Sequence, residues 1–411
     1  MKIFIADYLP LANKGEEEIL RGLEALYNKT GEENIFFSVF GDVTSTQQIG
    51  NVTVYSKSIC YPTYKSSGKL KVLFDIIRAG LNVFGHYPYR KEINKHTELI
   101  DDLKTADVIL IGHDGFFNLR CAMLGNYLHS VGLRYAILGA GFNKPGDKIS
   151  WIFNKVYKKC FDHADFVVLR EQTAYRYVKE LSKNKIVELF PDPAFFCPSD
   201  QYDVERVDDI VSKYDIEGDN VLKIGLTICE DSISFSRAFV GEKDRIEKHR
   251  DFIAKLITEI NNKHKCSFFF LPHCIKEGKG NDLVIAEDIK SRLPKTVVCM
   301  IIKEDMPVLD IKHLISKMDL VIGERTHSVI NSIATSTPFV SLTCSADFRT
   351  HDIVGIGCKL PQQVYDLDIP DDKELFRLVD KTITEKESMK KTLDNLCESY
   401  TSLKLKLQDI I

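Results

Sequence analysis

The chain has 411 residues, which is long enough for two domains that each bury a core of their own. Hydrophobic residues make up 44% of it and charged residues 28%, and the net charge of −4 excludes the basic excess that is typical of nucleic-acid-binding proteins. No stretch approaches the ~18 uncharged apolar residues that a membrane-spanning helix requires, so any membrane contact is expected to be peripheral.

Eleven cysteines are scattered along the chain, and most lie inside apolar stretches such as KCSFFFL and KTVVCMII. Their odd number and irregular spacing indicate buried thiols in a reducing compartment rather than a disulfide framework. No CxxC pair or His/Cys cluster has the spacing of a zinc site, so no metal is expected. The opening MKIFIADYLP has too short an apolar run for a signal peptide, and we expect a cytoplasmic protein.

The first half of the chain alternates short β-branched runs with helical patterns. Strands are predicted in KIFIA, ADVILIG, RYAILGA, DFVVLR and KIVELF, with a helix after each of the first four. This alternation indicates right-handed crossovers and a parallel sheet that is covered on both faces. We assign residues 1–195 to an N-terminal α/β domain, with a less regular insertion at about 55–100 that includes the helical pattern KLKVLFDIIRAGLNVF.

Prolines and acidic residues break the pattern after PDPAFFCPSD, and residues 196–220 are predicted to be a linker. The alternation resumes with strands in VLKIGLTI, CSFFFLP, TVVCMII, DLVIG and PFVSL, so residues 221–372 are assigned to a second α/β domain. Residues 373–411 are predicted to be an amphipathic helical tail. The expected fold is therefore two doubly wound, Rossmann-like parallel-sheet domains that face a cleft, with the ligand at the carboxyl ends of the strands.

The segment GERTHSVINSIATSTPFVSL carries the clearest chemical signal. A buried strand ends at its first glycine, and Thr326 or Ser328 is expected to cap the helix that follows. Arg325 and His327 then lie beside free helix N–H groups, where a helix N-terminus and a guanidinium group can hold a phosphate or carboxylate. The structural alternative is that Arg325 pairs with Glu324 and that His327 packs against the next loop.

The R-T-H triplet at 325–327, with the proline-led strand after it, resembles the R-x-H segment of the polysaccharide pyruvyl transferase family. Other segments agree in order: ADYLPLANKGEEEILRGLEAL resembles the family's first strand, N-x-G-D loop and first helix, and ADVILIGHDGFF, AILGAGF, FVVLRE and PDPAFF also fit. Two departures are Glu16, where an aspartate is usual, and the H-D pair in GHDG, which replaces glycines. The resemblance runs from about residue 3 to about 360 and implies a glycosyltransferase-B-like fold.

The resemblance also implies transfer of a pyruvyl group from phosphoenolpyruvate to two hydroxyls of a sugar in a cell-surface polysaccharide or its precursor, giving a cyclic ketal without a further cofactor. The donor's two anionic groups need cationic partners, and Arg325 and Arg170, from strand ends in the two domains, could meet across the cleft. Protonation of the vinyl carbon needs a donor, for which His327 is favoured because imidazole titrates near neutrality. Thr326 is assigned to substrate binding, and Arg170 could instead pair with Glu171.

Further substrate-binding candidates lie in strand-to-helix loops, and each has a structural alternative. His113 is a second candidate for the proton donor or a phosphate contact, or belongs to a simple turn. Asn13 and Gly15 lie where glycine allows close backbone approach to a ligand, or form only a capped surface loop. His273 could touch the sugar or satisfy a loop carbonyl. Arg349 could add positive charge.

Two other functions stay open. One is a nucleotide-sugar-dependent glycosyltransferase of the same fold, although Asn331 lies in the helix where retaining members commonly carry a glutamate for the ribose. The other is a non-catalytic glycan-binding relative, because Glu16 and the turn at His113 depart from the family pattern. The expected partners are phosphoenolpyruvate and a sugar or lipid-linked glycan, with no nucleic acid. A lipid-linked acceptor would bring the protein to the inner face of the membrane.

Overall fold

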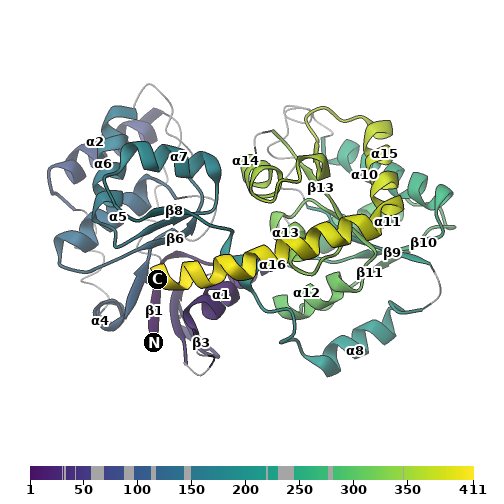
Figure 1. Cartoon of the computed structure of the whole chain (residues 1–411), viewed down its shortest axis with the longest axis horizontal. Coiled ribbons are helices and arrows are strands. Elements are labelled where there is room, and N and C mark those ends of the chain that lie inside the picture. The colour runs from purple at the N-terminus through teal and green to yellow at the C-terminus, as the bar shows by residue number, and fades with distance from the viewer. Residues whose placement is uncertain are drawn as a thin grey trace. The chain divides into compact units, whose positions relative to one another are not determined.

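The computed structural model describes the chain except for residues 30, 32–33, 42, 57–68, 88–96, 113–116, 143–149, 219–220, 230–244, 276–280 and 346. The chain divides into two compact units (Figure 1). Unit 1 comprises Met1–Leu11, Leu26–Asp192 and Lys406–Ile411, and unit 2 comprises Ala12–Ala25 and Pro193–Leu405.

Unit 1 is built on parallel strands in the order β3-β4-β2-β1-β5, followed by β6-β7-β8. The two groups are continuous, because Ala136 N donates to Ile109 O at 2.9 Å and Ile111 N donates to Ala136 O at 3.0 Å. Only β3 is antiparallel, at the outer edge. The strands are β1 (Lys2–Tyr8), β2 (Phe36–Phe40), β3 (Gln47–Ile49), β4 (Val52–Tyr55), β5 (Val108–Leu110), β6 (Ile137–Ala140), β7 (Val167–Leu169) and β8 (Val187–Leu189).

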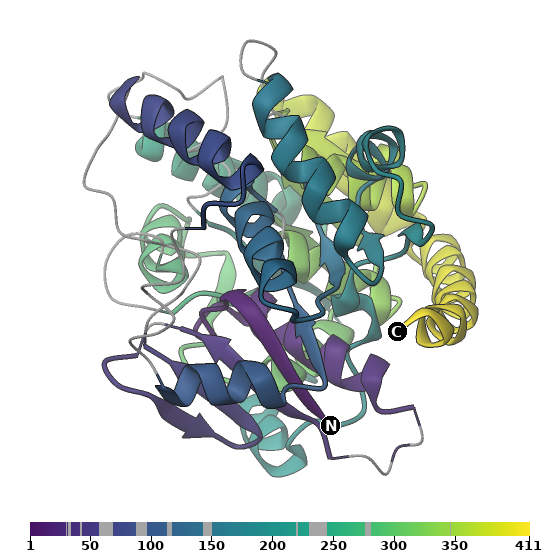
Figure 2. The ribbon, with the colours of Figure 1, turned by 90° about the vertical axis from the view of Figure 1, so that its left-hand side faces the viewer.

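Helices cover this sheet and bury its apolar residues. The helix α5 is buried along most of its length, and Asn118 caps it by accepting hydrogen bonds from two backbone N–H groups of its first turn. Figure 2 turns this unit toward the viewer, with its first strands in purple. The helices of unit 1 are α2 (Lys69–Val83), α4 (Thr97–Thr105), α5 (Leu119–Ser130), α6 (Ser150–His163) and α7 (Gln172–Leu181).

Unit 2 contains a six-stranded, fully parallel sheet in the order β11-β10-β9-β12-β13-β14. From β9 the chain first adds strands on one side and then returns to add β12 on the other, so the topological switch point lies between β9 and β12. Ligands of open α/β sheets bind outside the carboxyl ends of the strands at such a point. The strands are β9 (Leu222–Thr227), β10 (Cys266–Phe270), β11 (Val298–Ile301), β12 (Leu320–Gly323), β13 (Phe339–Thr343) and β14 (Val364–Asp366).

The helices of unit 2 follow the predicted alternation. Most connect successive strands, and the last two, α15 and α16, form the predicted C-terminal helices. The helical elements are α1 (Lys14–Tyr27), η1 (Pro193–Phe196), α8 (Val204–Lys213), α10 (Arg245–Lys263), α11 (Asp282–Ser291), α12 (Val308–Ser316), α13 (Thr326–Ala334), α14 (Phe348–Thr350), η2 (His351–Gly357), η3 (Pro361–Gln363), α15 (Asp372–Thr384) and α16 (Lys386–Ile410).

The first helix, α1, packs with unit 2 although it follows the first strand of unit 1. Its Glu18 is fully buried, 3.7 Å from the ammonium of the equally buried Lys312. Asn331 of α13 donates a hydrogen bond to the other oxygen of Glu18 at 3.1 Å. A charge with such partners is costly to expose or to leave unpaired, and this explains why α1 groups with unit 2 rather than with residues 1–195, where the sequence analysis placed it.

The segment 196–220, predicted as a linker, contains the helix α8. This helix is fixed to α12 because Asp310 accepts hydrogen bonds from Asp203 N at 3.0 Å and from the Arg206 guanidinium at 2.6 Å. Its two apolar positions, Val207 and Ile210, are buried. The segment is therefore a structured part of unit 2.

The predicted fold class is confirmed, since both units are α/β with parallel strands alternating with helices. Every described cysteine is a free thiol, and all but Cys397 are buried, as predicted. Among the described helices, none is long and apolar enough to cross a bilayer.

Candidate active site

The carboxyl end of β12 is tied to its neighbours by Glu324, which is buried. Its backbone N–H donates to Thr227 O, at the end of β9, at 3.0 Å. One carboxylate oxygen lies 2.6 Å from His249 Nε2, and the other accepts from Cys229 N at 2.9 Å. Glu324 therefore holds the switch point together, and it is not the partner proposed for Arg325 in the structural alternative.

Arg325 is itself the N-cap residue of α13, with an extended backbone (φ −81°, ψ 116°) and no side-chain cap. The prediction that Thr326 or Ser328 caps this helix was wrong. Ser328 Oγ instead donates to Arg325 O at 2.7 Å, and Thr326 Oγ1 lies 2.8 Å from Thr350 Oγ1. Because no side chain caps the helix, its first N–H groups stay suited to an anion.

Asp282 is the partner of Arg325. Its Oδ1 accepts from Arg325 Nη2 at 2.6 Å, and its Oδ2 accepts from the backbone N–H groups of His273 and Cys274, both at 3.0 Å. Burial raises the pKa of Asp282 and outweighs the attraction of the Arg325 charge. One carboxylate thus fixes the guanidinium against the loop after β10, a role that the sequence analysis missed.

Gly15 lies against the imidazole of His327. A Cβ atom at this glycine would be 2.4 Å from His327 Nδ1 and 2.7 Å from its Cγ, so any larger residue would displace the ring. The loop around Gly15 is held by Asn13, whose side chain accepts from Gly15 N at 3.2 Å and whose backbone pairs with Cys274. The close backbone approach predicted for Gly15 is present, and it is an approach to His327.

His273 follows β10 and is buried. Its Nδ1 lies 3.0 Å from Leu271 O, which can only accept, so Nδ1 carries the proton and Nε2 carries a lone pair. Among the described residues Nε2 has no hydrogen-bond partner. Burial above all, together with the charges of Arg325, His327 and Lys14, lowers the pKa of His273 to about 3. The ring is therefore neutral at neutral pH.

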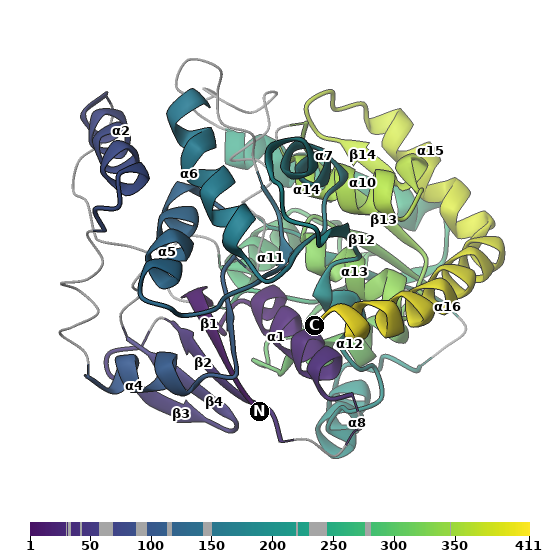
Figure 3. The ribbon, with the colours of Figure 1, turned by 60° about the vertical axis from the view of Figure 1, so that its left-hand side comes forward.

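We call these neighbouring residues the switch-point cluster: Lys14, Gly15, His273, Asp282, Arg325 and His327. Three helices begin in it, namely α1 at Lys14, α11 at Asp282 and α13 just after Arg325; Figure 3 labels all three. Lys14 is buried, its N–H donates to His273 O at 3.1 Å, and its ammonium is 2.7 Å from Asp305. The first N–H groups of α1 and α11 are bonded within the protein, and Asn281 caps α11. The uncapped start of α13, together with an arginine and a lysine, therefore favours an anionic ligand.

Arg170 belongs to unit 1, at the end of β7. Its side chain is buried, forms an ion pair with Asp192 and lies 3.6 Å from Glu171 Oε1. Two carboxylates account for this arginine without a ligand, and they include the Glu171 of the structural alternative. A substrate-binding role for Arg170, and its meeting with Arg325, stay predictions.

The remaining candidates are only partly placed. Arg349 forms an ion pair with Asp347, with nitrogen–oxygen distances of 2.9 and 3.3 Å. His113 lies outside the described residues, so its predicted role stays a prediction. Among the described residues, no group of three or more His, Cys, Asp or Glu is placed to hold a metal ion.

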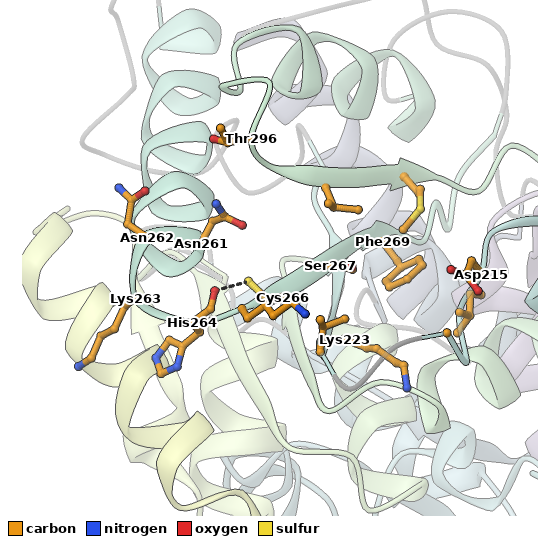
Figure 4. Close-up of a pocket in the computed structure, with 16 residues that line it drawn as sticks. Asp215, Lys223, Asn261, Asn262, Lys263, His264, Cys266, Ser267, Phe269 and Thr296 are labelled. Atoms are coloured by element: carbon orange, nitrogen blue, oxygen red, sulfur yellow. Dashed lines mark hydrogen bonds between the residues drawn. The ribbon is translucent and has the colours of Figure 1, made fainter.

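A separate pocket of about 540 Å³ lies at the opposite edge of the unit 2 sheet (Figure 4). Cys266 and Val298, the first residues of β10 and β11, line it, together with Lys223 near the start of β9. Parallel sheets bind their ligands at the carboxyl ends of the strands. We therefore assign the candidate active site to the switch-point cluster and not to this pocket.

Comparisons with known proteins agree with this arrangement. One similar solved structure is S. aureus MnaA in a co-structure with UDP, at 12% identity and a TM-score of 0.54, covering 97% of this chain and 92% of that one. The trehalose-6-phosphate synthase OtsA has 10% identity and a TM-score of 0.56, with coverages of 99% and 97%. The UDP-GlcNAc 2-epimerase from Neisseria meningitidis, bound to UDP-GlcNAc, has 10% identity and a TM-score of 0.52, with coverages of 99% and 100%. At such identities the likeness shows the fold alone, which is that of glycosyltransferase-B enzymes and epimerases with two Rossmann-like domains.

No curated protein matches the chain significantly. A family model does match, over residues 13–345, from the loop before α1 to just past β13. Its description is polysaccharide pyruvyl transferase. The matched region contains every residue of the switch-point cluster, and the chain belongs to the polysaccharide pyruvyl transferase family.

Proposed function

We propose that this protein transfers a pyruvyl group from phosphoenolpyruvate to two hydroxyls of one sugar in a cell-surface polysaccharide or its precursor, which forms a pyruvate ketal. The observation that carries the proposal is the switch-point cluster, which combines fixed cations, the uncapped N-terminus of α13 and two imidazoles at the edge where α/β sheets bind ligands. Phosphoenolpyruvate bears a carboxylate and a phosphate. Arg325, fixed by Asp282, and Lys14, which lies near Asp305 and Glu17, are the cations proposed to meet these groups.

His327 is proposed as the proton donor. As an imidazolium it gives a proton to the vinyl CH₂ carbon, which becomes the methyl group. The neighbouring carbon then bonds to the oxygen of the first sugar hydroxyl, and the proton of that hydroxyl passes to the now neutral imidazole. The second hydroxyl displaces phosphate from the same carbon and closes the ring, and its proton leaves with the phosphate. Packing of the ring against Gly15 supports this role, because proton transfer requires a fixed orientation of the donor.

His273 is proposed to accept a hydrogen bond from a sugar hydroxyl. Its pKa of about 3 makes it a weak base, but the lone pair on Nε2 is buried and has no partner among the described residues. A buried polar atom without a partner costs about 1–3 kcal/mol, which a bound hydroxyl would recover. This assignment keeps the acceptor sugar on the β10 side of the cluster.

The alternative of a nucleotide-sugar-dependent glycosyltransferase gains no specific support. At the helix position where retaining members carry an acid for the ribose, this chain has Asn331, whose amide donates to Glu18 inside the network that fixes α1. That contact gives Asn331 a structural role.

The test is incubation with phosphoenolpyruvate and defined glycans, followed by measurement of phosphate release and of the ketal methyl signal by NMR. We expect Arg325→Ala and His327→Ala each to lower turnover at least tenfold, which is about 1.4 kcal/mol of activation free energy. Arg325→Lys should also lower it, because a point charge lacks the planar fork. Arg134→Ala, which removes an exposed ion pair of unit 1, is the matched control. Unchanged turnover in both alanine variants, or release of nucleoside diphosphate from a sugar nucleotide, would contradict the proposal.

A further inference from the structure

The outer face of α2, in unit 1, carries a stripe of exposed apolar side chains. Leu73, Ile77 and Leu81 recur every four residues, so they lie along one side of the helix, and Phe74 lies next to them. Phe84 follows directly after the helix and continues its spacing, since its backbone N–H donates to Gly80 O at 3.2 Å. Between 44% and 83% of the surface of each residue is exposed, with Phe84 the most exposed. We call these five residues the α2 stripe: an apolar surface on α2 and on the residue that follows it.

The opposite face of α2 holds the helix to unit 1. Ala79 and Asn82 are fully buried, Asn82 donates to Met123 O at 3.3 Å, and Asn126 donates to Asn82 at 2.8 Å. A helix that only covers a core has polar residues on its outer side. Because α2 is already anchored through its inner face, the apolar outer face marks an interaction surface.

The neighbouring helix α6 adds an exposed tryptophan. Trp151, the only tryptophan of the chain, lies in the first turn of α6 and is 65% exposed, with the Lys155 ammonium 5.3 Å from its ring centre. The next residue, Ile152, touches α2, since a Cβ on Gly80 would lie 3.6 Å from its Cδ1. The two helices also lie side by side in Figure 1. Tryptophan is enriched where a protein meets the headgroup level of a bilayer.

The charge of these two helices is opposite to that of the whole protein. The chain has a net charge of −4, whereas α2 and α6 carry six lysines and arginines against two aspartates. Apolar residues flanked by cations fit a surface that offers both hydrocarbon and negative charge. A bilayer with anionic headgroups has both.

We propose that the α2 stripe and Trp151 dock unit 1 on an anionic lipid bilayer. The apolar side chains enter the boundary between headgroups and acyl chains, and Lys155, beside Trp151, meets the headgroups. The inference rests on the surface of unit 1 and not on the proposed reaction. A peripheral enzyme held in this way would meet a lipid-linked acceptor without a membrane anchor.

The test uses the full chain with vesicles of phosphatidylcholine, with and without phosphatidylglycerol. We expect co-sedimentation with the anionic vesicles, weakened by salt, and a blue shift of Trp151 emission that brominated lipids quench. The double variant Ile77→Asp/Phe84→Asp should lower the partition coefficient at least ~tenfold. Ile369→Asp, at a position of unit 2 that is 76% exposed, is the matched control and should leave binding unchanged. Circular dichroism and urea unfolding check that both variants fold like the parent.

Three outcomes would overturn the inference. The first is an absence of binding to either kind of vesicle, or equal binding to both. The second is binding that the double variant retains. The third is a doubled mass in solution without lipid that the double variant abolishes, which would make the face an interface between two copies of the chain. Because vesicle binding needs neither phosphoenolpyruvate nor a glycan, failure here is distinguishable from failure of the proposed reaction.

Discussion

Replacing Gly15 by alanine adds one methyl group at the point where α1 touches His327. The new Cβ would be 2.4 Å from His327 Nδ1, whereas two non-bonded heavy atoms prefer a separation of about 3.5 Å, so the ring must move by about 1 Å. A displacement of that size in a catalytic group costs on the order of 100-fold in rate, or about 2.7 kcal/mol. We therefore expect kcat of Gly15→Ala to fall about 100-fold. The free energy of unfolding, measured alongside, separates this loss from any destabilisation that the same clash causes.

The assay is phosphate release from phosphoenolpyruvate in the presence of the acceptor glycan, with urea unfolding of each variant measured in parallel. In a His327→Ala background the clashing ring is absent, so Gly15→Ala should have no further effect on the residual rate. Gly80→Ala is the matched control, since its Cβ would meet only one side-chain atom at an ordinary 3.6 Å. Normal turnover in Gly15→Ala would refute the reasoning. So would a Gly15→Ala/His327→Ala variant whose loss of rate equals the product of the losses in the two single variants.

Three further predictions concern residues that position or support the cluster. Asp282→Asn replaces one accepting oxygen by an NH₂ group, which then faces either Arg325 or two backbone N–H groups. Steady-state kinetics should show a KM for phosphoenolpyruvate about tenfold higher, which is about 1.4 kcal/mol of binding free energy. An unchanged KM would contradict this prediction. Lys312→Met leaves the buried carboxylate of Glu18 beside a methionine, and urea unfolding should show a free energy of unfolding about 3–5 kcal/mol lower. The double variant Lys312→Met/Glu18→Gln has no buried charge at this place and should recover most of that loss. His273, with its folded pKa lowered to about 3, binds a proton only after unfolding, so stability falls as the pH drops below about 6.5, by up to about 1.4 kcal/mol per pH unit. In His273→Asn this dependence should be weaker between about pH 7 and 4.5, and an equal slope would show that the ring does not cause it.

The strands of both units could be predicted because a buried parallel strand is a nearly continuous apolar run. β12, with the sequence LVIG, and β13, with FVSLT, are buried at every position and were predicted within a residue or so. β2 and β4 were not predicted. They are short, each has positions that are not buried, and they lie in a part of the chain without alternating helices, so no local period distinguished them.

The site was predictable where its chemistry is local. Arg325, His327 and Gly15 follow the ends of predicted strands at the starts of predicted helices, so position and residue type together indicated an anion site. Asp282 gave no such signal, because an aspartate in the first turn of a helix is usual and its bond to Arg325 spans 43 positions of sequence. Glu18 looked like one more charged residue of α1, although its contact with α13 lies 313 positions away. Single-sequence patterns do not carry contacts of that range.

The packing of α1 has a consequence for recombination among relatives. The chain enters unit 2 at Ala12, leaves it after Ala25 and returns at Pro193, so the two halves are not exchangeable at a single crossover. A chimera joined near Pro193 would pair Lys312 and His327 with the first helix of another protein. The residues at the positions of Glu18, which neutralises Lys312, and Gly15, which leaves room for His327, would then come from that other protein. Unit 2 of this chain can be transplanted with its buried ion pair and its histidine packing intact only when α1 travels with it.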